Sequence, residues 1–244
     1  MLEGEKAPSD APAPDTTSTL EPVPLSDTAP PPAASSTTQY TPEEFYQDYN
    51  TALQVVNGYW ANRWSDFFTG TYSPPQLITG SEFGTGMYLG GSDQILCGNG
   101  ARAIFLGPQN AYYCGLPYDP DDDYLAFDVN FLWRARENGD MFVYMIVAHE
   151  WGHAIQARLD TALQRVEYEL QADCLAGATL QGAVNDGTLV LEQGDIEEVS
   201  IGLSDIADEG PWGKPGDHGS PDQRIENFTT GADNGVLACL PQLQ

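Results

Sequence analysis

The chain has 244 residues and a hydrophobic content of 41%, which is enough for one sizeable core and excludes a wholly disordered protein. Its 36 Asp and Glu residues against 9 Lys and Arg give a formal net charge of -27. Such a surface repels nucleic acid and anionic lipid, so we expect neither as a partner. No apolar run approaches the length of a membrane span, so we also expect no direct membrane insertion by this sequence.

Residues 1–38 are rich in Pro, Ala, Ser, Thr and Asp and contain almost no large apolar side chain. This composition predicts a disordered, partly polyproline linker, because it cannot bury enough surface to offset the entropy of ordering. We place a single folded domain over residues 39–244. Residues 1–10 lack the apolar centre of a signal peptide, so we expect any export or anchor segment to lie outside this sequence.

Helix and strand signals then alternate along the domain. Thr41-Pro42-Glu43-Glu44 has the pattern of a capping box and predicts a helix from 42 to about 64, whose aromatic stripe we assign to the core. Short apolar runs predict strands at 86–89, 101–106, 110–114 and 124–127 in a small antiparallel sheet. Further helices are predicted at 129–136, 141–159, 162–184, 192–207 and 221–228, with Asp140 capping the second of these and capping boxes at Thr161 and Ser220.

The four cysteines, Cys97, Cys114, Cys174 and Cys239, allow three disulfide connectivities. We predict Cys97–Cys114, which closes a loop of hairpin size, and Cys174–Cys239, which pins the C-terminal region to the helix predicted at 162–184. Four reduced thiols in a cytosolic protein are the alternative. Asp121–Asp123 is either a calcium site or a solvated loop, and its spacing, which fits no EF-hand, favours the loop.

The strongest chemical signal is His149-Glu150-Trp151-Gly152-His153, at the end of an apolar helical run. Residues four apart lie on one face of a helix, so His149 and His153 can hold one metal ion between their rings. Glu150 lies one step round the helix, where it can act as general base on water. The competing interpretation is two core histidines beside a solvated helix face.

A third ligand is predicted from the spacing beyond His153. Seven residues separate His153 from the turn at Asp160, and seven separate Ala162 from Glu169, so each leg of an antiparallel helical hairpin is about 10 Å long. This places Glu169 level with His153, with Glu167 and Asp173 as weaker rivals. Three protein ligands and one open position are typical of catalytic zinc.

Three further residues are assigned supporting roles. Asp173, one turn beyond Glu169, is placed to accept a hydrogen bond from a ligand histidine. His218 is a candidate donor to a tetrahedral oxyanion, with an exposed loop histidine as the alternative. Arg224 is expected to pair with Asp173 or Glu169.

Three segments together resemble the bacterial neutral zinc metallopeptidases: Ala148–Gln156, with its H-E-W-G-H; Glu169–Gly177, with its E-L-Q-A-D-C; and Gly219–Arg224. The likeness covers about residues 85–240. It implies a protein that is membrane-anchored or exported. It also implies a mainly helical, zincin-like α+β fold that is distantly similar to that of the glutamate-zincins. In those enzymes the Glu of an E-x-x-A-D motif, here Glu169, is the third ligand. Gly219 stands where their H-P-x-x-x-x-R element has proline, and the segment between His153 and Glu169 is shorter than the family usually has.

We therefore expect a zinc metalloendopeptidase with one Zn2+ per chain, acting outside the cytoplasm on a protein or peptide substrate. Two alternatives remain open. One is a non-catalytic exported zinc-binding or scaffold module of the same fold, and the other is a zinc hydrolase that acts on a non-peptide amide.

Overall fold

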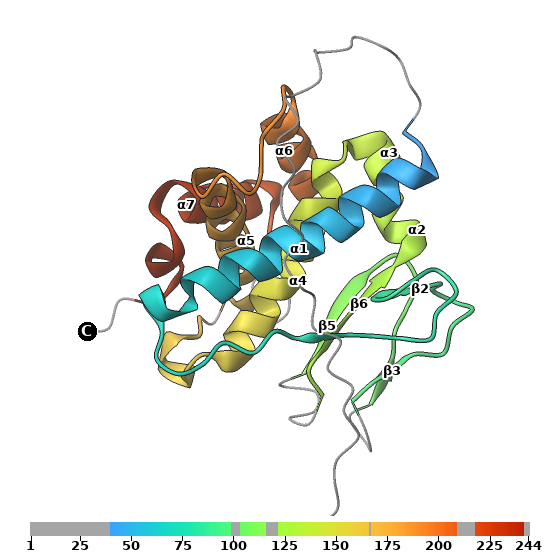
Figure 1. Ribbon diagram of the computed structural model, residues 1–244, viewed down its shortest axis with the longest axis horizontal. Coiled ribbons are helices and arrows are strands. Elements are labelled where there is room, and N and C mark those ends of the chain that lie inside the picture. Colours follow the sequence, from blue (N-terminus) through green and yellow to red (C-terminus); the bar gives the residue numbers. More distant parts are fainter. Residues whose placement is uncertain (1–39, 99–102, 116–121, 166, 209–217, 242–244) are drawn as a thin grey trace, which may run out of the picture. The chain divides into compact units, whose positions relative to one another are not determined.

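The computed structural model describes residues 40–98, 103–115, 122–165, 167–208 and 218–241. The predicted linker over residues 1–38 lies outside the described residues. Residues Gln39–Gln244 form one compact unit. Its α-helices are α1 (Pro42–Phe67), α2 (Val129–Leu132), α3 (Ala135–Asn138), α4 (Met141–Arg158), α5 (Tyr168–Asn185), α6 (Asp195–Asp205) and α7 (Pro221–Asn234). Its strands are β1 (Gln76–Leu77), β2 (Met87–Tyr88), β3 (Leu96–Cys97), β4 (Ile104–Phe105), β5 (Ala111–Cys114) and β6 (Tyr124–Asp128), and short 3-10 turns η2 (Thr161–Leu163) and η3 (Val236–Cys239) complete it. The unit is thus mainly helical with a small sheet, as the α+β prediction has it, and the helices and strands gather on separate sides (Figure 1).

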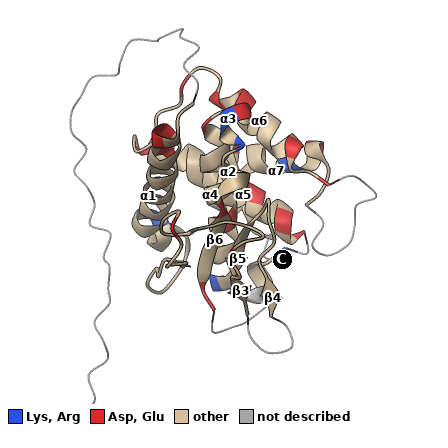
Figure 2. Ribbon diagram, turned by 90° about the vertical axis from the view of Figure 1, so that its right-hand side faces the viewer, with Lys and Arg blue, Asp and Glu red and all other residues tan. Residues whose placement is uncertain are grey.

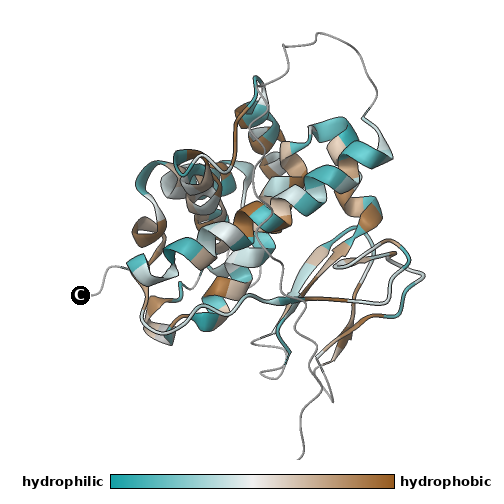
Figure 3. Ribbon diagram, in the orientation of Figure 1, coloured by the Kyte–Doolittle hydropathy of each residue, from teal (hydrophilic) through white to brown (hydrophobic). Residues whose placement is uncertain are grey.

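Helix α1 begins as the capping box predicts. The Thr41 hydroxyl accepts a hydrogen bond from the Glu44 backbone N–H, and the Glu44 carboxylate accepts one from Thr41. The aromatic stripe is buried, with Tyr49 2% and Trp60 0% exposed, so its assignment to the core is confirmed. Along α1, hydrophobic positions alternate with hydrophilic ones in Figure 3, which fits a helix lying on the core with one face.

Helix α4 carries the H-E-W-G-H segment through the centre of the unit, packed against α1, α5 and α6. Every residue from Met141 to Gln156 is buried. Gly152 has a structural use, because a Cβ there would lie 2.9 Å from the Ala172 carbonyl oxygen of α5. Glycine therefore lets the two helices approach closely beside the motif histidines. Asp140 occupies the N-cap position, but the prediction that its side chain caps the helix is wrong.

Contacts between α4 and α5 run in opposite directions along the two helices: His149 meets Asp173, and His153 meets Glu169. The hairpin is therefore antiparallel. The predicted turn is wrong in detail, because α5 begins at Tyr168 and not at Ala162, and Glu169 lies in its first turn.

No α-helix begins at the predicted capping box of Thr161, where the chain forms the short 3-10 turn η2. Nearby backbone groups are bound by side chains instead. Asp160 accepts the Ala162 N–H, and the Gln164 amide donates to the Gln156 carbonyl. The buried Gln171 amide accepts from the Arg165 N–H and donates to the Leu163 carbonyl. These bonds satisfy the backbone after η2 without a helix.

The sheet differs from the predicted antiparallel one. Strand β6 pairs with β5 antiparallel but with β1 and β2 parallel, so the four-stranded sheet is mixed. Strands β3 and β4 form a separate antiparallel pair. The segment predicted as one helix at 129–136 is two short helices, α2 and α3, and α7 continues six residues past Phe228 to Asn234.

Both predicted disulfides are present, with Cα–Cα distances of 5.4 Å for Cys97–Cys114 and 5.5 Å for Cys174–Cys239. The first joins β5 to β3. The second ties η3 to the middle of α5, next to Asp173. Helices α5 and α7 also pack closely, and glycine makes this possible. A Cβ on Gly177 or Gly231 would collide with the backbone of the opposite helix. In the described residues, no helix is long and apolar enough to cross a membrane.

The carboxylates of Asp140, Asp195 and Glu198 lie close together where α6 meets the start of α4, and Figure 2 shows acidic residues near α3 and α6. Burial and the nearby charges of Asp140 and Asp195 raise the pKa of Glu198 to about 7. The folded chain then holds this proton at pH values where the unfolded chain has released it. Its stabilising contribution is present below about pH 4.5 and is lost as the pH rises through about 7.

We therefore expect Glu198→Gln to raise the Tm at about pH 8, where it removes a repelled charge, and to change it little at about pH 4. Thermal unfolding at both pH values measures this. Glu197→Gln, an exposed neighbour in the same turn, is the matched control. An equal Tm gain at both pH values would contradict the assignment.

Candidate metal centre

His149 is held in one orientation by a buried ion pair. Its Nδ1 lies 2.8 Å from Asp173 Oδ1, and Arg224 donates to both oxygens of the same carboxylate, from Nε at 2.8 Å and from Nη2 at 2.7 Å. The Arg224 Nη1 also donates to the Ile206 carbonyl. Burial raises the pKa of Asp173, but Arg224 and His149 outweigh it and lower the pKa. Since an ionised carboxylate only accepts, His149 Nδ1 carries the proton and donates it.

His153 is oriented by an amide network. Its Nδ1 lies 2.8 Å from Gln156 Oε1, while Gln156 Nε2 donates to the Tyr168 carbonyl at 2.7 Å and to Gln171 Oε1 at 3.0 Å. The Gln156 amide is thereby fixed with its oxygen toward the imidazole, so His153 Nδ1 is also the donor. The Tyr168 ring stacks on His153 at 4.9 Å.

Nε2 of each histidine is directed at the Glu169 carboxylate on the neighbouring helix. Glu169 Oε2 lies 3.3 Å from His149 Nε2 and 3.2 Å from His153 Nε2. Three potential ligand atoms thus converge in a buried place, where a proton or a metal ion between them offsets the repulsion of their electron pairs. A tetrahedral zinc ion with bonds of about 2.0–2.1 Å separates its ligand atoms by about 3.3 Å, so the residues fit this metal.

The electrostatics also favour a cation. Burial lowers the pKa of His149, but Asp173 and Glu169 outweigh it and raise this pKa to about 10. Burial likewise opposes ionisation of Glu169, yet the two histidines hold the pKa of its carboxyl well below the usual range. The site therefore favours positive charge beside an ionised Glu169, whether a proton on His149 or a metal ion carries it.

Glu150 stands beside this cluster on α4 and is 7% exposed. Burial raises its pKa, while His153 and His149 act in the opposite direction. A raised pKa makes the carboxylate a stronger base, which favours the proton uptake that a general base requires.

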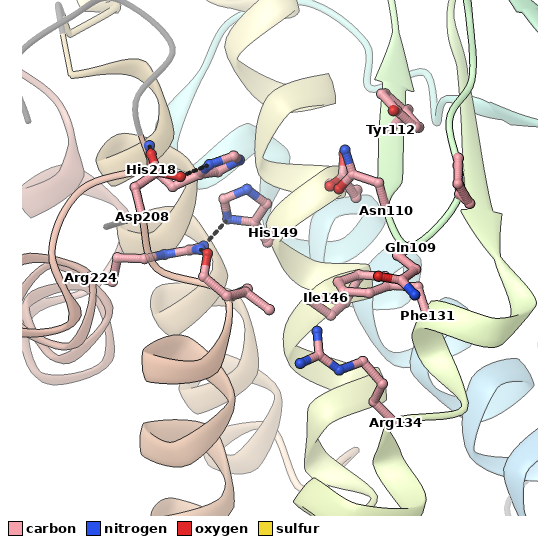
Figure 4. Close-up of a pocket in the computed structure, with 13 residues that line it drawn as sticks. Gln109, Asn110, Tyr112, Phe131, Arg134, Ile146, His149, Asp208, His218 and Arg224 are labelled. Carbon is pink, nitrogen blue, oxygen red and sulfur yellow. Dashed lines mark hydrogen bonds and ion pairs between the residues drawn. The ribbon is translucent and has the colours of Figure 1, made fainter. Parts of the chain in front are cut away.

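A cavity of about 300 Å³ opens over Glu150 and His149 (Figure 4). His218 and Asp208 lie on one wall; His218 Nδ1 is 3.2 Å from Asp208 Oδ1, and His218 Nε2 is 3.9 Å from Glu169 Oε2. The opposite wall is formed by Gln109, Asn110 and Tyr112, at the start of β5.

The structure thus brings every predicted site residue into one region: His149, Glu150, His153, Glu169, Asp173, His218 and Arg224. The rival ligand Glu167 lies apart, exposed at the N-cap of α5 and 3.7 Å from Arg165. Of the acidic run, Asp121 lies outside the described residues, Asp122 accepts from the Gly98 N–H, and Asp123 pairs with Arg158.

Sequence reasoning missed the amides that orient the site and the cavity walls. Gln156 follows His153 by three residues, a spacing that puts it on the same helix face and could have been used. Asp208 and the Gln109–Tyr112 wall are distant in sequence and carry no local signal. A second group of close carboxylates, Asp140, Asp195 and Glu198, accepts backbone N–H bonds from Glu192 and Met141 and is assigned no ion.

No family model, curated protein or solved structure matches this chain.

Proposed function

We propose that the chain is a zinc-dependent metalloendopeptidase of the glutamate-zincin type, similar to the bacterial neutral zinc metallopeptidases. One Zn2+ would be held by His149, His153 and Glu169. The observation that carries this proposal is the convergence of three potential ligand atoms, one from each of these side chains, beside a buried Glu150. When bound, zinc supplies a Lewis acid that polarises the scissile carbonyl and acidifies water.

The side chains divide the remaining chemistry. Glu150 takes a proton from the attacking water and returns it to the leaving amine. His218, whose Nδ1 lies 3.2 Å from Asp208 Oδ1, would donate from Nε2 to the developing oxyanion. Asp173 and Gln156 keep the two ligand histidines in the tautomer that offers Nε2.

A peptide substrate is supported by the cavity wall. Strand β5 pairs with β6 along one side, and among the described strands nothing pairs with its other side. An extended peptide can add to such an edge through main-chain hydrogen bonds. Asn110 and Tyr112 belong to this wall and line the cavity over Glu150, so the added strand would cross the candidate centre.

Export is proposed from the same structure. Two disulfides within one unit form and persist in an oxidising compartment, and a cytosolic protein rarely has them. We therefore propose that the enzyme acts outside the cytoplasm.

Metal removal tests the proposal. Chelation should abolish cleavage of a broad peptide library and lower the Tm, since a ligand at about a thousand times its Kd stabilises a fold by about 4 kcal/mol. One equivalent of Zn2+ should restore both. His149→Ala should prevent the recovery.

The outcomes separate the alternatives. Stoichiometric zinc without cleavage of any peptide would favour the non-catalytic binding module. Release of products from a non-peptide amide alone, identified by mass spectrometry, would favour the other hydrolase. A chain that binds no zinc would refute the metal centre.

A further inference from the structure

Arg134 lies between α2 and α3 and lines the same cavity as His149 and Glu150. Figure 4 shows His149 and Arg134 on either side of Ile146, with the guanidinium directed into the space. Its side chain is 38% exposed. A substrate that reaches Glu150 therefore has a cation within the same cavity.

Most of the hydrogen-bonding capacity of Arg134 is unused. Its Nη2 pairs with Asp205, whose Oδ2 also accepts from Asn138 at 3.2 Å. Among the described residues no other hydrogen bond holds this guanidinium, although arginine offers a fork of N–H donors that matches a carboxylate. Both partners of the pair are solvent-exposed, so the bond is weak and open to exchange.

The other arginine of the cavity and the Asp208 carboxylate are already engaged. Arg224 is buried and bound to Asp173, and Asp208 is bound to His218. Arg134 is thus the exposed arginine of the described lining. Between it and His149 the wall is apolar, formed by Ile146 and by Phe131, whose ring centre lies 5.8 Å from the guanidinium carbon.

We propose that Arg134 binds a carboxylate of the peptide substrate and gives the cleft a preference for an acidic residue near the scissile bond. This rests on the proposed function. The apolar wall suits the methylene groups of a glutamate side chain, and the guanidinium suits its carboxylate. The carboxylate of a peptide C-terminus has the same chemistry and is the second possible source.

The proposal opposes what the net charge of -27 alone would suggest. The long-range field attracts cationic peptides and is screened by salt, whereas a direct guanidinium–carboxylate contact acts at short range. At about 0.15 M salt the long-range field is screened, so the measured preference reports mainly the direct guanidinium–carboxylate contact.

The test uses internally quenched, C-terminally amidated peptides built on a sequence that the zinc-loaded enzyme cuts. Each position flanking the cut bond carries Glu, Gln or Lys in turn. At one position we expect Glu to exceed Gln by about tenfold in kcat/KM, as one charge-assisted contact allows. Arg134→Gln should abolish this preference, so that the variant cuts the Glu and Gln peptides with equal kcat/KM.

Arg136→Gln is the matched control. Arg136 lies in α3, pairs with exposed Glu137 and stacks over Trp133, but it does not line the cavity. It should keep the preference although it removes the same charge. Asp205→Asn should increase the preference for Glu, because it frees the Arg134 guanidinium. If the Arg134–Asp205 pair were merely structural, Asp205→Asn and Arg134→Gln would have the same effect on this preference.

A binding measurement separates this inference from the chemistry. Fluorescence anisotropy with the Glu150→Gln protein should show the Glu peptide bound about tenfold more tightly than the Gln peptide, and equally after Arg134→Gln. A preference confined to peptides with a free C-terminal carboxylate would support carboxylate binding and assign it to the terminus. Cleavage with no carboxylate preference would overturn the inference alone, and no cleavage of any peptide would overturn the proposed function together with it.

Discussion

Glu150→Gln should reduce kcat for peptide cleavage by about 10²–10⁴-fold, because glutamine has the shape of glutamate but cannot accept the proton of the attacking water. The proposed zinc content of one per chain should stay the same, since the proposed ligand atoms belong to His149, His153 and Glu169. Steady-state kinetics and metal analysis of the same preparation measure the two quantities.

The pH profile adds an independent readout. Burial raises the pKa of Glu150, so the acidic limb of kcat/KM should lie above the ordinary range of a glutamate and vanish in the variant's residual activity. Glu167→Gln, an exposed glutamate at the start of α5, is the matched control and should keep full activity. Full activity in a zinc-loaded Glu150→Gln enzyme would refute the general-base assignment.

Arg224→Met should lower the free energy of unfolding by about 3–5 kcal/mol, the usual cost of leaving one member of a buried ion pair without its partner. Arg224 and Asp173 each have side chains only 1% exposed, so water cannot replace the lost guanidinium. Urea denaturation of the metal-free proteins measures the change.

Two further variants give this prediction its contrast. Arg63→Met breaks an exposed pair with Asp186 and should change stability little. Asp173→Leu combined with Arg224→Met should recover much of the stability and yet bind zinc about 10–100-fold more weakly, because His149 loses the acceptor that orients it. A double variant with normal zinc affinity would contradict the role of Asp173.

Local patterns predicted the helices well. The capping boxes at Thr41 and Ser220 have the expected bonds, because both motifs complete themselves within four residues. The apolar run before His149 predicted α4 correctly for a similar reason. The same logic failed at Thr161, where Gln171 binds the backbone from the next helix, a contact that no local pattern reveals.

In the candidate site, too, local patterns were predicted and contacts between distant segments were missed. His149, His153 and Glu150 share one helix turn, and the antiparallel return of α5 brings Glu169 to them even though the predicted turn was misplaced. The mixed sheet was missed because strands of two residues, such as β1 and β2, have no measurable alternation. Arg134 was missed because its place in the cavity depends on how α2 and α3 meet α4.

Arg224 and Cys239 lie near the C-terminal end, long after the proposed zinc ligands. During synthesis, or during export that begins at the N-terminus, His149, His153 and Glu169 emerge before Arg224, which is the charged partner of Asp173. A fragment that stops before Pro221 would hold every proposed ligand and the general base, but Asp173 would have His149 as a partner and no Arg224. We therefore expect the proposed hydrolytic activity to appear only when α7 has docked on α5.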